Sequence, residues 1–186
     1  MGREIEARLL EVDEKTFLEK LNSLGATFVG DWIQIRKLYD FTPKKQNSWI
    51  RLRTNGDKTT LTIKEIENEK IDGTKEWEIE VSDFDTTCEI LAKMGYMPRS
   101  TQENRRIRFM LDSVEIDIDF WPLIPTYVEF EAESEEAVKL VCEKLQVEFN
   151  KLVTLDVTSI YEHYGIPFDS LPAIIELEDE RKQLKF

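Results

Sequence analysis

Residues 3–10 of the chain, REIEARLL, decide how the rest is interpreted, because charged and apolar side chains alternate along them. Glu4, Glu6 and Arg8 occupy every second position, with apolar residues such as Ile5 between them. In a β-strand, successive side chains point to opposite faces of the sheet. The segment therefore predicts a strand with two carboxylates and a guanidinium on one face and apolar side chains on the other.

The same alternation recurs along much of the chain. In each case residues of one charge sign share a strand face, and apolar residues occupy the opposite face. The pattern predicts a β protein with one charged face, sorted strand by strand into acidic and basic rows. The further alternating residues are Arg51 and Arg53, Lys64 with Thr60 and Thr62, Glu76, Glu78 and Glu80, Arg106 and Arg108, Glu115, Asp117 and Asp119, and Glu129 and Glu131.

A solvated sheet face is the simplest explanation for any single strand of this kind, because antiparallel sheets often expose one face to water. It explains the whole set less well. Like charges two residues apart on one strand face lie about 7 Å apart and repel each other. Solvated strands usually mix both charge signs, which avoids this repulsion. The acidic rows therefore require a counter-charge.

A divalent cation would supply that counter-charge, because carboxylate oxygens are preferred ligands of Mg²⁺ and Mn²⁺. The basic rows require an anionic partner instead. Several arginines and one lysine that converge on one cavity are typical of an oligophosphate site. Acidic and basic rows in the same cavity therefore indicate a metal ion together with a polyphosphate.

The composition indicates a soluble, intracellular protein. Its 186 residues suit one domain with a sizeable core. The formal net charge of −13, without a basic patch, argues against a nucleic-acid or anionic-membrane partner. No segment approaches the roughly 20 apolar residues of a membrane span, and no signal peptide is recognisable, so a cytoplasmic location is expected. Cys88 and Cys142 are expected on apolar helix faces, in a reducing compartment.

Turn and cap signals divide the chain into eight strands and four helices. A charged tail beyond Pro172 is expected as a solvated helix or a frayed end, so that residues 1–170 form the domain and 171–186 the tail. The helices are expected to begin after Asp13, Asp83, Ser134 and Asp156, and three of them to end at Gly25, Gly95 and Gly165. The strands are expected near residues 3–10, 34–41, 49–54, 59–65, after the turn at 72–73, and near 104–111, 114–120 and 127–133.

The two halves of the chain share one element order, βαβββ, because Asp13 and Asp83 correspond at an offset of 70 residues, as do Leu21 and Leu91. Eight antiparallel strands can close into a barrel with room inside for a small ligand. The predicted fold class is therefore α+β, mainly β: an eight-stranded closed tunnel barrel. Charged faces point inward, apolar faces point outward, and the helices pack on the outside.

The ordered series of motifs resembles the CYTH superfamily of triphosphate tunnel metalloenzymes, which includes thiamine-triphosphatases, tripolyphosphatases and class IV adenylyl cyclases. The resemblance covers about residues 3 to 165 and implies an antiparallel tunnel with a triphosphate and Mg²⁺ or Mn²⁺ inside. The motifs are EIEAR at 4–8, RLR at 51–53, TIK at 62–64, EWEIE at 76–80, RIR at 106–108 and EFE at 129–131.

The rows and the resemblance together assign candidate site residues. Arg8 and Lys64 are the catalytic candidates. The candidate phosphate-binding residues are Arg8, Arg51, Arg53, Lys64, Arg106 and Arg108. The candidate metal ligands are Glu4, Glu6, Glu78, Asp117, Glu129 and Glu131, with Glu76, Glu80, Glu115 and Asp119 as further acidic candidates.

Two positions depart from the superfamily pattern. The opening motif of the superfamily usually closes with lysine, and here that position is Arg8. Arginine keeps the charge, but its very high pKa removes any role in proton transfer. The Pro-rich segment 121–125 replaces a turn that often contains glycine, and it is expected to be a structural loop or a contact at the tunnel mouth.

Three functions remain open at this stage. Hydrolysis of the terminal phosphate of a triphosphate such as tripolyphosphate, thiamine triphosphate or ATP is the leading hypothesis. A class IV-type adenylyl cyclase would use the same parts, with attack by the ribose 3′-hydroxyl of ATP on the α-phosphate. A non-catalytic triphosphate or nucleotide binder is the third, motivated by Arg8. The expected partner is a triphosphate-containing small molecule, and a homodimer stays open. Trp49, which shares a face with Arg51, is expected either to stack on a substrate ring or to plug the end of the barrel, and His163 is expected on a helix surface.

Overall fold

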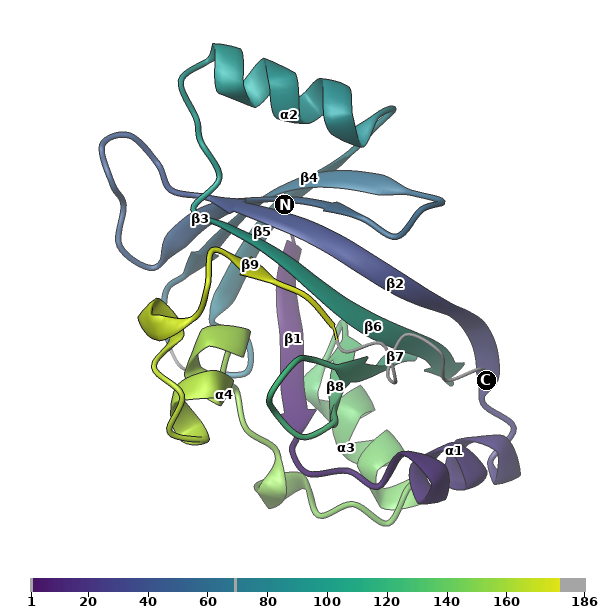
Figure 1. Cartoon of the computed structure of the whole chain (residues 1–186). Helices are drawn as coiled ribbons and strands as arrows, with labels where there is room; N and C mark the ends of the chain where they lie inside the picture. Colours follow the sequence, from purple (N-terminus) through teal and green to yellow (C-terminus); the bar gives the residue numbers. More distant parts are fainter. Residues whose placement is uncertain (1, 69, 178–186) are drawn as a thin grey trace.

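The structure, a computed structural model, describes residues 2–68 and 70–177 (Figure 1). It contains a long antiparallel sheet with helices packed on its outer side. The helices are α1 (Glu14–Ser23), α2 (Phe84–Lys93), α3 (Glu135–Lys144) and α4 (Val157–His163), with two 3₁₀ turns at Phe149–Lys151 and Phe168–Ser170. The strands are β1 (Gly2–Leu9), β2 (Thr27–Tyr39), β3 (Ser48–Thr54), β4 (Thr59–Ile66), β5 (Thr74–Val81), β6 (Ser100–Leu111), β7 (Val114–Phe120), β8 (Tyr127–Ala132) and β9 (Ile174–Ile175).

The eight predicted strands and four predicted helices are all present, in the predicted order. The largest differences are at β2, which begins at Thr27 rather than near Gln34, and at β6, which begins at Ser100 rather than near Asn104. The pairing of β2 with β6 shifts register between Phe28 and Gly30. That shift interrupts the alternation and hides the first part of β2 from a period-two search.

Side-chain caps fix where the helices begin. The side chains of Asp13 and Asp83 accept hydrogen bonds from the backbone N–H groups three residues later, at 2.9 and 2.6 Å, and Ser134 and Asp156 cap α3 and α4 in the same way. Gly25 and Gly95 follow α1 and α2 with φ of 71° and 91°, the left-handed conformation that glycine adopts without strain. The predicted helix boundaries are confirmed.

The sheet order is β2-β3-β4-β5-β1-β8-β7-β6-β9, and all neighbours are antiparallel except β6 and β9. β2 pairs with β6 along most of its length. In contrast, β1 and β5 share only the pairs from Gly2–Glu76 to Glu4–Thr74. The sheet therefore curls as a half-barrel, and among strands β1 to β8 the shortest pairing is the one between β1 and β5 (Figure 1).

The apolar core lies outside the curled sheet, as predicted. One cluster joins α1 and α3 to the outer faces of β6, β7 and β8, through residues such as Phe17, Val138 and Phe130, each at most 4% exposed. A second cluster packs α2 against β3. The cover is incomplete, which corrects the expectation that the helices shield every outer face: Trp77 and Ile79 on β5 are 38% and 62% exposed.

The segment after Pro172 differs from the expected solvated helix or frayed end. Ile174 and Ile175 form β9 beside the start of β6, and Leu177 is buried. The rest of the predicted tail, residues 178–186, lies outside the described residues. Both cysteines are free, and Cys142 is buried in the α3 interface. In the described part of the chain, no helix is long and apolar enough to cross a membrane.

Candidate functional site

A cavity of about 940 Å³ lies on the concave side of the sheet. Strand alternation directs the charged residues of the sheet into it, because their apolar neighbours pack under the helices outside. Loop residues such as Lys45 and Asn47, and the first turn of α4, complete its lining. Of the residues predicted from the sequence, those that line the cavity are Glu6, Arg8, Arg51, Arg53, Lys64, Glu76, Glu78, Arg106, Arg108, Glu115, Glu129 and Glu131.

The inner faces of β1, β7 and β8 form one side of this cavity, which we call the acidic wall. Glu6 on β1 lies opposite Glu131 on β8, and Glu131 lies opposite Glu115 on β7. Three carboxylates therefore follow one another across three neighbouring strands. Within the described residues, the Glu131 carboxylate makes no ion pair or hydrogen bond, although the residue is mostly buried.

Like-charge repulsion is visible in the protonation equilibria of this row. Burial, together with the nearby charge of Asp117, raises the pKa of Glu115 to about 7. Burial and the charge of Glu129 likewise raise the pKa of Glu131. Both shifts oppose the ionised form, so a cation beside the row would be stabilised.

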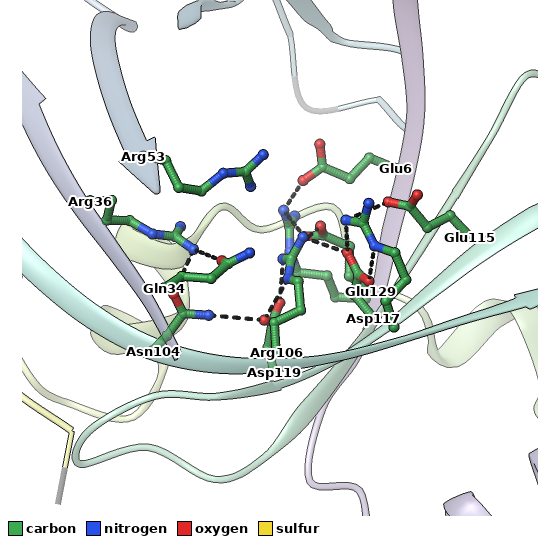
Figure 2. Close-up of polar contacts among 12 residues, drawn as sticks. Glu6, Gln34, Arg36, Arg53, Asn104, Arg106, Glu115, Asp117, Asp119 and Glu129 are labelled. Carbon is green, nitrogen blue, oxygen red and sulfur yellow. Dashed lines mark hydrogen bonds and ion pairs between the residues drawn. The ribbon is translucent and has the colours of Figure 1, made fainter. Parts of the chain in front are cut away.

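Arg106 on β6 projects onto the acidic wall (Figure 2), and Arg108 on the same strand contacts this wall through Asp117. Arg106 donates from Nε and Nη2 to both oxygens of Asp119, at 2.8 and 2.5 Å, and its Nη2 lies 3.1 Å from Glu129 Oε1. Its Nη1 lies 2.5 Å from Asp117 Oδ2. Arg108 donates to both oxygens of Asp117, at 2.7 and 2.8 Å. Burial lowers the pKa of Arg106, but the adjacent carboxylates outweigh it and hold that pKa well above its usual range.

Arg8, the departure from the superfamily pattern, contacts three different residues of the protein. Its Nη1 donates to the Leu155 carbonyl at 2.7 Å, its Nη2 lies 2.5 Å from Glu129 Oε2, and it also contacts Glu6. Burial raises the pKa of Glu129, but the charges of Arg8 and Arg106 outweigh it and hold this pKa below its usual range. Arg8 thus fixes Glu129 in its ionised form and joins β1 to the segment before α4.

The inner faces of β2, β3 and β4 form the opposite side, which we call the basic wall. Arg51 Nη2 lies 2.9 Å from Glu76 Oε1 and 3.4 Å from Glu78 Oε2, and Lys64 Nζ lies 2.8 Å from Glu76 Oε2. Arg53 is only within 3.8 Å of Glu78. Among the described residues, its carboxylate partners are Glu76 and Glu78 on β5 and Glu6 on β1, whose Oε2 lies 3.8 Å from Lys64 Nζ, and they are fewer than its cations.

Arg36 on β2 also belongs to the basic wall, and the sequence analysis missed it. Its Nη2 donates to Gln34 Oε1 at 2.8 Å and to Asn104 Oδ1 at 2.7 Å, and its guanidinium lies 4.5 Å from the centre of the Trp121 ring. The signal was present, because Gln34 and Arg36 alternate with Ile33 and Ile35. Lys37 follows directly and obscures that alternation.

The remaining predicted residues lie in different places. Asp117 and Asp119 are almost fully buried beneath Arg106 rather than on the cavity surface. Glu80 lies on the exposed rim of β5, with its carboxylate 3.1 Å from Lys58 Nζ. The backbone of Glu4 pairs with Thr74, but its side chain lies outside the described part of the structure.

The carboxylate oxygens of the acidic wall are chemically suited to a hard cation, although the described side chains do not form a preassembled metal site. Among the described residues, no three histidine, cysteine, aspartate or glutamate side chains are grouped as a metal site. The carboxylates instead contact arginines, except for Glu131 on the row with Glu6 and Glu115. Oxygen donors of this kind suit Mg²⁺ or Mn²⁺.

The loop after β7 is structural, with one link to the cavity. Tyr161 on α4 donates to the Pro122 carbonyl at 2.7 Å, and Trp121 packs edge-on against Tyr161. The ring of Trp121 also contacts the guanidinium of Arg36. The Pro-rich loop therefore anchors α4 and also supports a residue of the basic wall.

A family comparison places most of the chain in one family. The model of the CYTH domain matches residues 2–162. No curated protein sequence gave a significant match.

Solved structures with the same fold come from distant organisms. A conserved hypothetical protein from Pyrococcus furiosus is 22% identical, with a TM-score of 0.71, covering 84% of this chain and 99% of the other. A protein from Vibrio parahaemolyticus described as a candidate adenylate cyclase is 15% identical, with a TM-score of 0.71, covering 87% and 99%. A candidate adenylyl cyclase from Hippeastrum, described as having a dominant triphosphatase activity, is 15% identical, with a TM-score of 0.60, covering 93% and 99%. At these identities the comparison shows the fold.

Proposed function

The chain belongs to the CYTH domain family, and on that basis we propose that it hydrolyses the terminal phosphate of a triphosphate with the help of Mg²⁺ or Mn²⁺. In this proposal the curled sheet encloses the substrate as a tunnel. One observation carries it: a single cavity is lined by carboxylates on β1, β7 and β8 and by an excess of cations on β2, β3 and β4.

The basic wall and β6 would bind the phosphate oxygens. Guanidinium groups bind phosphate through paired, charge-assisted hydrogen bonds. Arg53 is available for such bonds, because its only ion pair in the described part of the chain is 3.8 Å long. The candidate phosphate-binding set is Arg8, Arg51, Arg53, Lys64, Arg106 and Arg108.

The acidic wall would hold the divalent cation. Glu6, Glu115 and Glu131 lie in one row across three strands, and Glu129 adjoins them. A bound cation would neutralise the repulsion within this row and would polarise the phosphate that it contacts. Glu4 and Glu78 remain further candidate ligands, and Asp117 would act by orienting Arg106 and Arg108.

The residues of the chain supply charge and position. A water molecule hydrogen-bonded to a carboxylate of the acidic wall would attack the terminal phosphorus and give its proton to that wall. The new oxygen–phosphorus bond forms as the bridging bond breaks, and the leaving phosphate chain stays on Arg51 and Arg53. Lys64 would neutralise charge on the transferred group, since in-line positioning and charge compensation dominate this chemistry. Arg8 holds Glu129 ionised rather than moving a proton.

Cyclisation of ATP is the second candidate, because Trp49 lines the cavity on the strand that carries Arg51 and Arg53. An aromatic ring at that place would stack on an adenine base. Three structural neighbours are also described as candidate adenylyl cyclases. The third candidate, a binder without turnover, would follow if Arg8 cannot replace the usual lysine.

Product identification separates these functions. The protein is incubated with Mg²⁺ or Mn²⁺ and, separately, with tripolyphosphate, thiamine triphosphate or ATP, and the products are analysed by mass spectrometry. We expect orthophosphate. Cyclic AMP with pyrophosphate would establish the cyclase instead. Tight binding without any product would establish the binder, and Arg8→Lys would then test whether this one residue accounts for the missing turnover.

A further inference from the structure

Among the described residues, Arg36 is a buried cation without an anionic partner. It is only 6% exposed, and both hydrogen bonds that it donates go to neutral amides, those of Gln34 and Asn104. Its Nε is buried and has no hydrogen-bond partner among the described residues. A buried charge is normally paired, because its desolvation is costly.

The surroundings of Arg36 add to this cost. Burial and the charges of Arg51 and Arg53 hold the pKa of Arg36 well below its usual range. Arg53 is affected in the same way: the charge of Arg51, burial and the charge of Arg106 lower its pKa to about 9. A guanidinium nevertheless stays protonated at neutral pH. The like-charge repulsion is therefore retained in the ligand-free protein and would be removed by an anion.

Asp119, whose charge acts on Arg36, cannot serve as that anion. Asp119 is occupied by Arg106 through two hydrogen bonds, and it also accepts one from Asn104 Nδ2 at 3.1 Å. Asn104 in turn uses its oxygen to accept from Arg36. The Asn104 amide therefore lies between Arg36 and Asp119, and Arg36 makes no direct hydrogen bond to that carboxylate.

The groups around Arg36 that remain available are hydrogen-bond donors. The amide oxygen of Gln34 is taken by Arg36, and Figure 2 shows the amide nitrogen of Gln34 pointing away from Arg36, toward the centre of the group of labelled side chains. Arg53 is the residue opposite Arg36 on the neighbouring strand β3. Donors without a free acceptor, next to unpaired positive charge, are suited to a phosphate group.

We propose that Arg36, with Gln34 and Arg53, binds one phosphate of the substrate directly and thereby selects triphosphates over diphosphates. This inference deepens the proposed function and rests on it. Arg36 lies on β2, whereas the carboxylate row that would hold the cation lies on β1, β7 and β8, with Arg106 between them. A ligand held by Arg106 and Arg108, which contact the acidic wall, therefore needs a third phosphate to reach Arg36 as well.

Calorimetric titration of the whole chain with tripolyphosphate and with pyrophosphate tests this selection. EDTA is added to the titrations, because it stops metal-dependent turnover and the proposed contact needs no metal. We expect the wild type to bind tripolyphosphate more tightly than pyrophosphate. In Arg36→Gln the preference should fall by about tenfold or more, the effect of losing one hydrogen bond to a charged group. Affinity for pyrophosphate should stay within about twofold.

Arg105→Gln is the matched control. Arg105 is adjacent to Arg106 on β6 and is buried like Arg36, but it points outward and pairs with both oxygens of Asp31, at 2.8 and 2.6 Å. This variant should lower the thermal midpoint without changing the preference for tripolyphosphate. Arg36→Lys, which keeps the charge on a shorter donor, should give an intermediate preference and replaces Arg36→Gln if the latter does not fold.

The outcomes separate this inference from the proposed function. An unchanged preference in Arg36→Gln, an equal loss of affinity for both ligands, or no preference in the wild type would overturn the role of Arg36. A lost preference in Arg105→Gln would do the same. Release of orthophosphate by the wild type with Mg²⁺, measured separately, decides the proposed function. A wild type that shows the preference but no turnover would leave Arg36 as the selective contact of a binding protein.

Discussion

Arg106 and Arg36 lie on neighbouring strands, face the same cavity and are equally buried, yet they differ in every partner. Arg106 contacts Asp117, Asp119 and Glu129, whereas Arg36 contacts two amides and a tryptophan ring. On the acidic wall, carboxylates raise the pKa of the arginine, whereas on the basic wall burial and neighbouring arginines lower it. The surroundings of an arginine, rather than its burial, determine how many of its N–H groups already contact carboxylates before a ligand binds.

This contrast has an energetic meaning. The ion pairs of the acidic wall are internally compensated, so they need no ligand to be stable, and removal of one partner leaves buried carboxylates unpaired. The basic wall is undercompensated, so an anion lowers its free energy. Variants on the acidic wall should therefore mainly lower the stability of the protein. Variants on the basic wall should mainly weaken the binding of an anion.

The largest expected effect comes from removing the cation that the acidic wall would hold. With excess EDTA, or in Glu131→Gln, release of orthophosphate from tripolyphosphate should fall to the uncatalysed rate, because the carboxylate row loses its counter-charge or a ligand. A colorimetric phosphate assay measures this. Glu80→Gln, on the exposed rim of β5, is the matched control and should keep the wild-type rate. Full activity in EDTA would show that the two walls are not divided between metal and phosphate.

The second effect is on stability at the acidic wall. Arg106→Gln should lower the free energy of unfolding by about 3–5 kcal/mol, because buried Asp117, Asp119 and Glu129 lose a shared partner. Urea denaturation in EDTA measures the loss, and Mg²⁺ should restore part of it. A loss as small as that of a surface variant would mean that these ion pairs are solvated.

The third effect is on binding at the basic wall. Arg53→Gln should weaken tripolyphosphate binding by about 1.5–3 kcal/mol, the range for hydrogen bonds to charged groups. Its free energy of unfolding should change by less than about 1 kcal/mol, because its only recorded ion pair within the described residues is 3.8 Å long. Calorimetry and urea denaturation of the same preparation give both values. An effect on stability larger than that on binding would place Arg53 with the internally paired arginines.

The smallest effect is expected on the outer face of the half-barrel. Ile79→Thr should change the free energy of unfolding by no more than about 0.5 kcal/mol, because Ile79 is 62% exposed. Ile107→Thr, at a fully buried outward position of β6, is the control and should cost more. Equal losses would show that the outer face of β5 is covered in solution.

The sequence predicted the acidic and basic rows because strand alternation needs only local information. Glu6, Arg51 and Arg106 could be assigned to one face without knowing their partners. Arg36 could not, because Lys37 directly after it obscures the alternation and because its lack of a carboxylate depends on Asn104, far away in the sequence. The bare outer face of β5 was missed for a related reason: apolar residues predict burial but not which helix covers them.

Sequence separation differs between the two walls, and it bears on how the protein folds. The basic wall is built from consecutive strands, and Thr54 pairs with Thr59 across one tight turn. The acidic wall requires Ile5 to pair with Ala132, so an early strand must meet one that is synthesised much later. Closing so long a loop is entropically costly and slow. On the ribosome, residues 5–9 of β1 would therefore lack their partner strand until β8 emerges, whereas the hairpin of β3 and β4 would meet the carboxylates of β5 as soon as that strand follows.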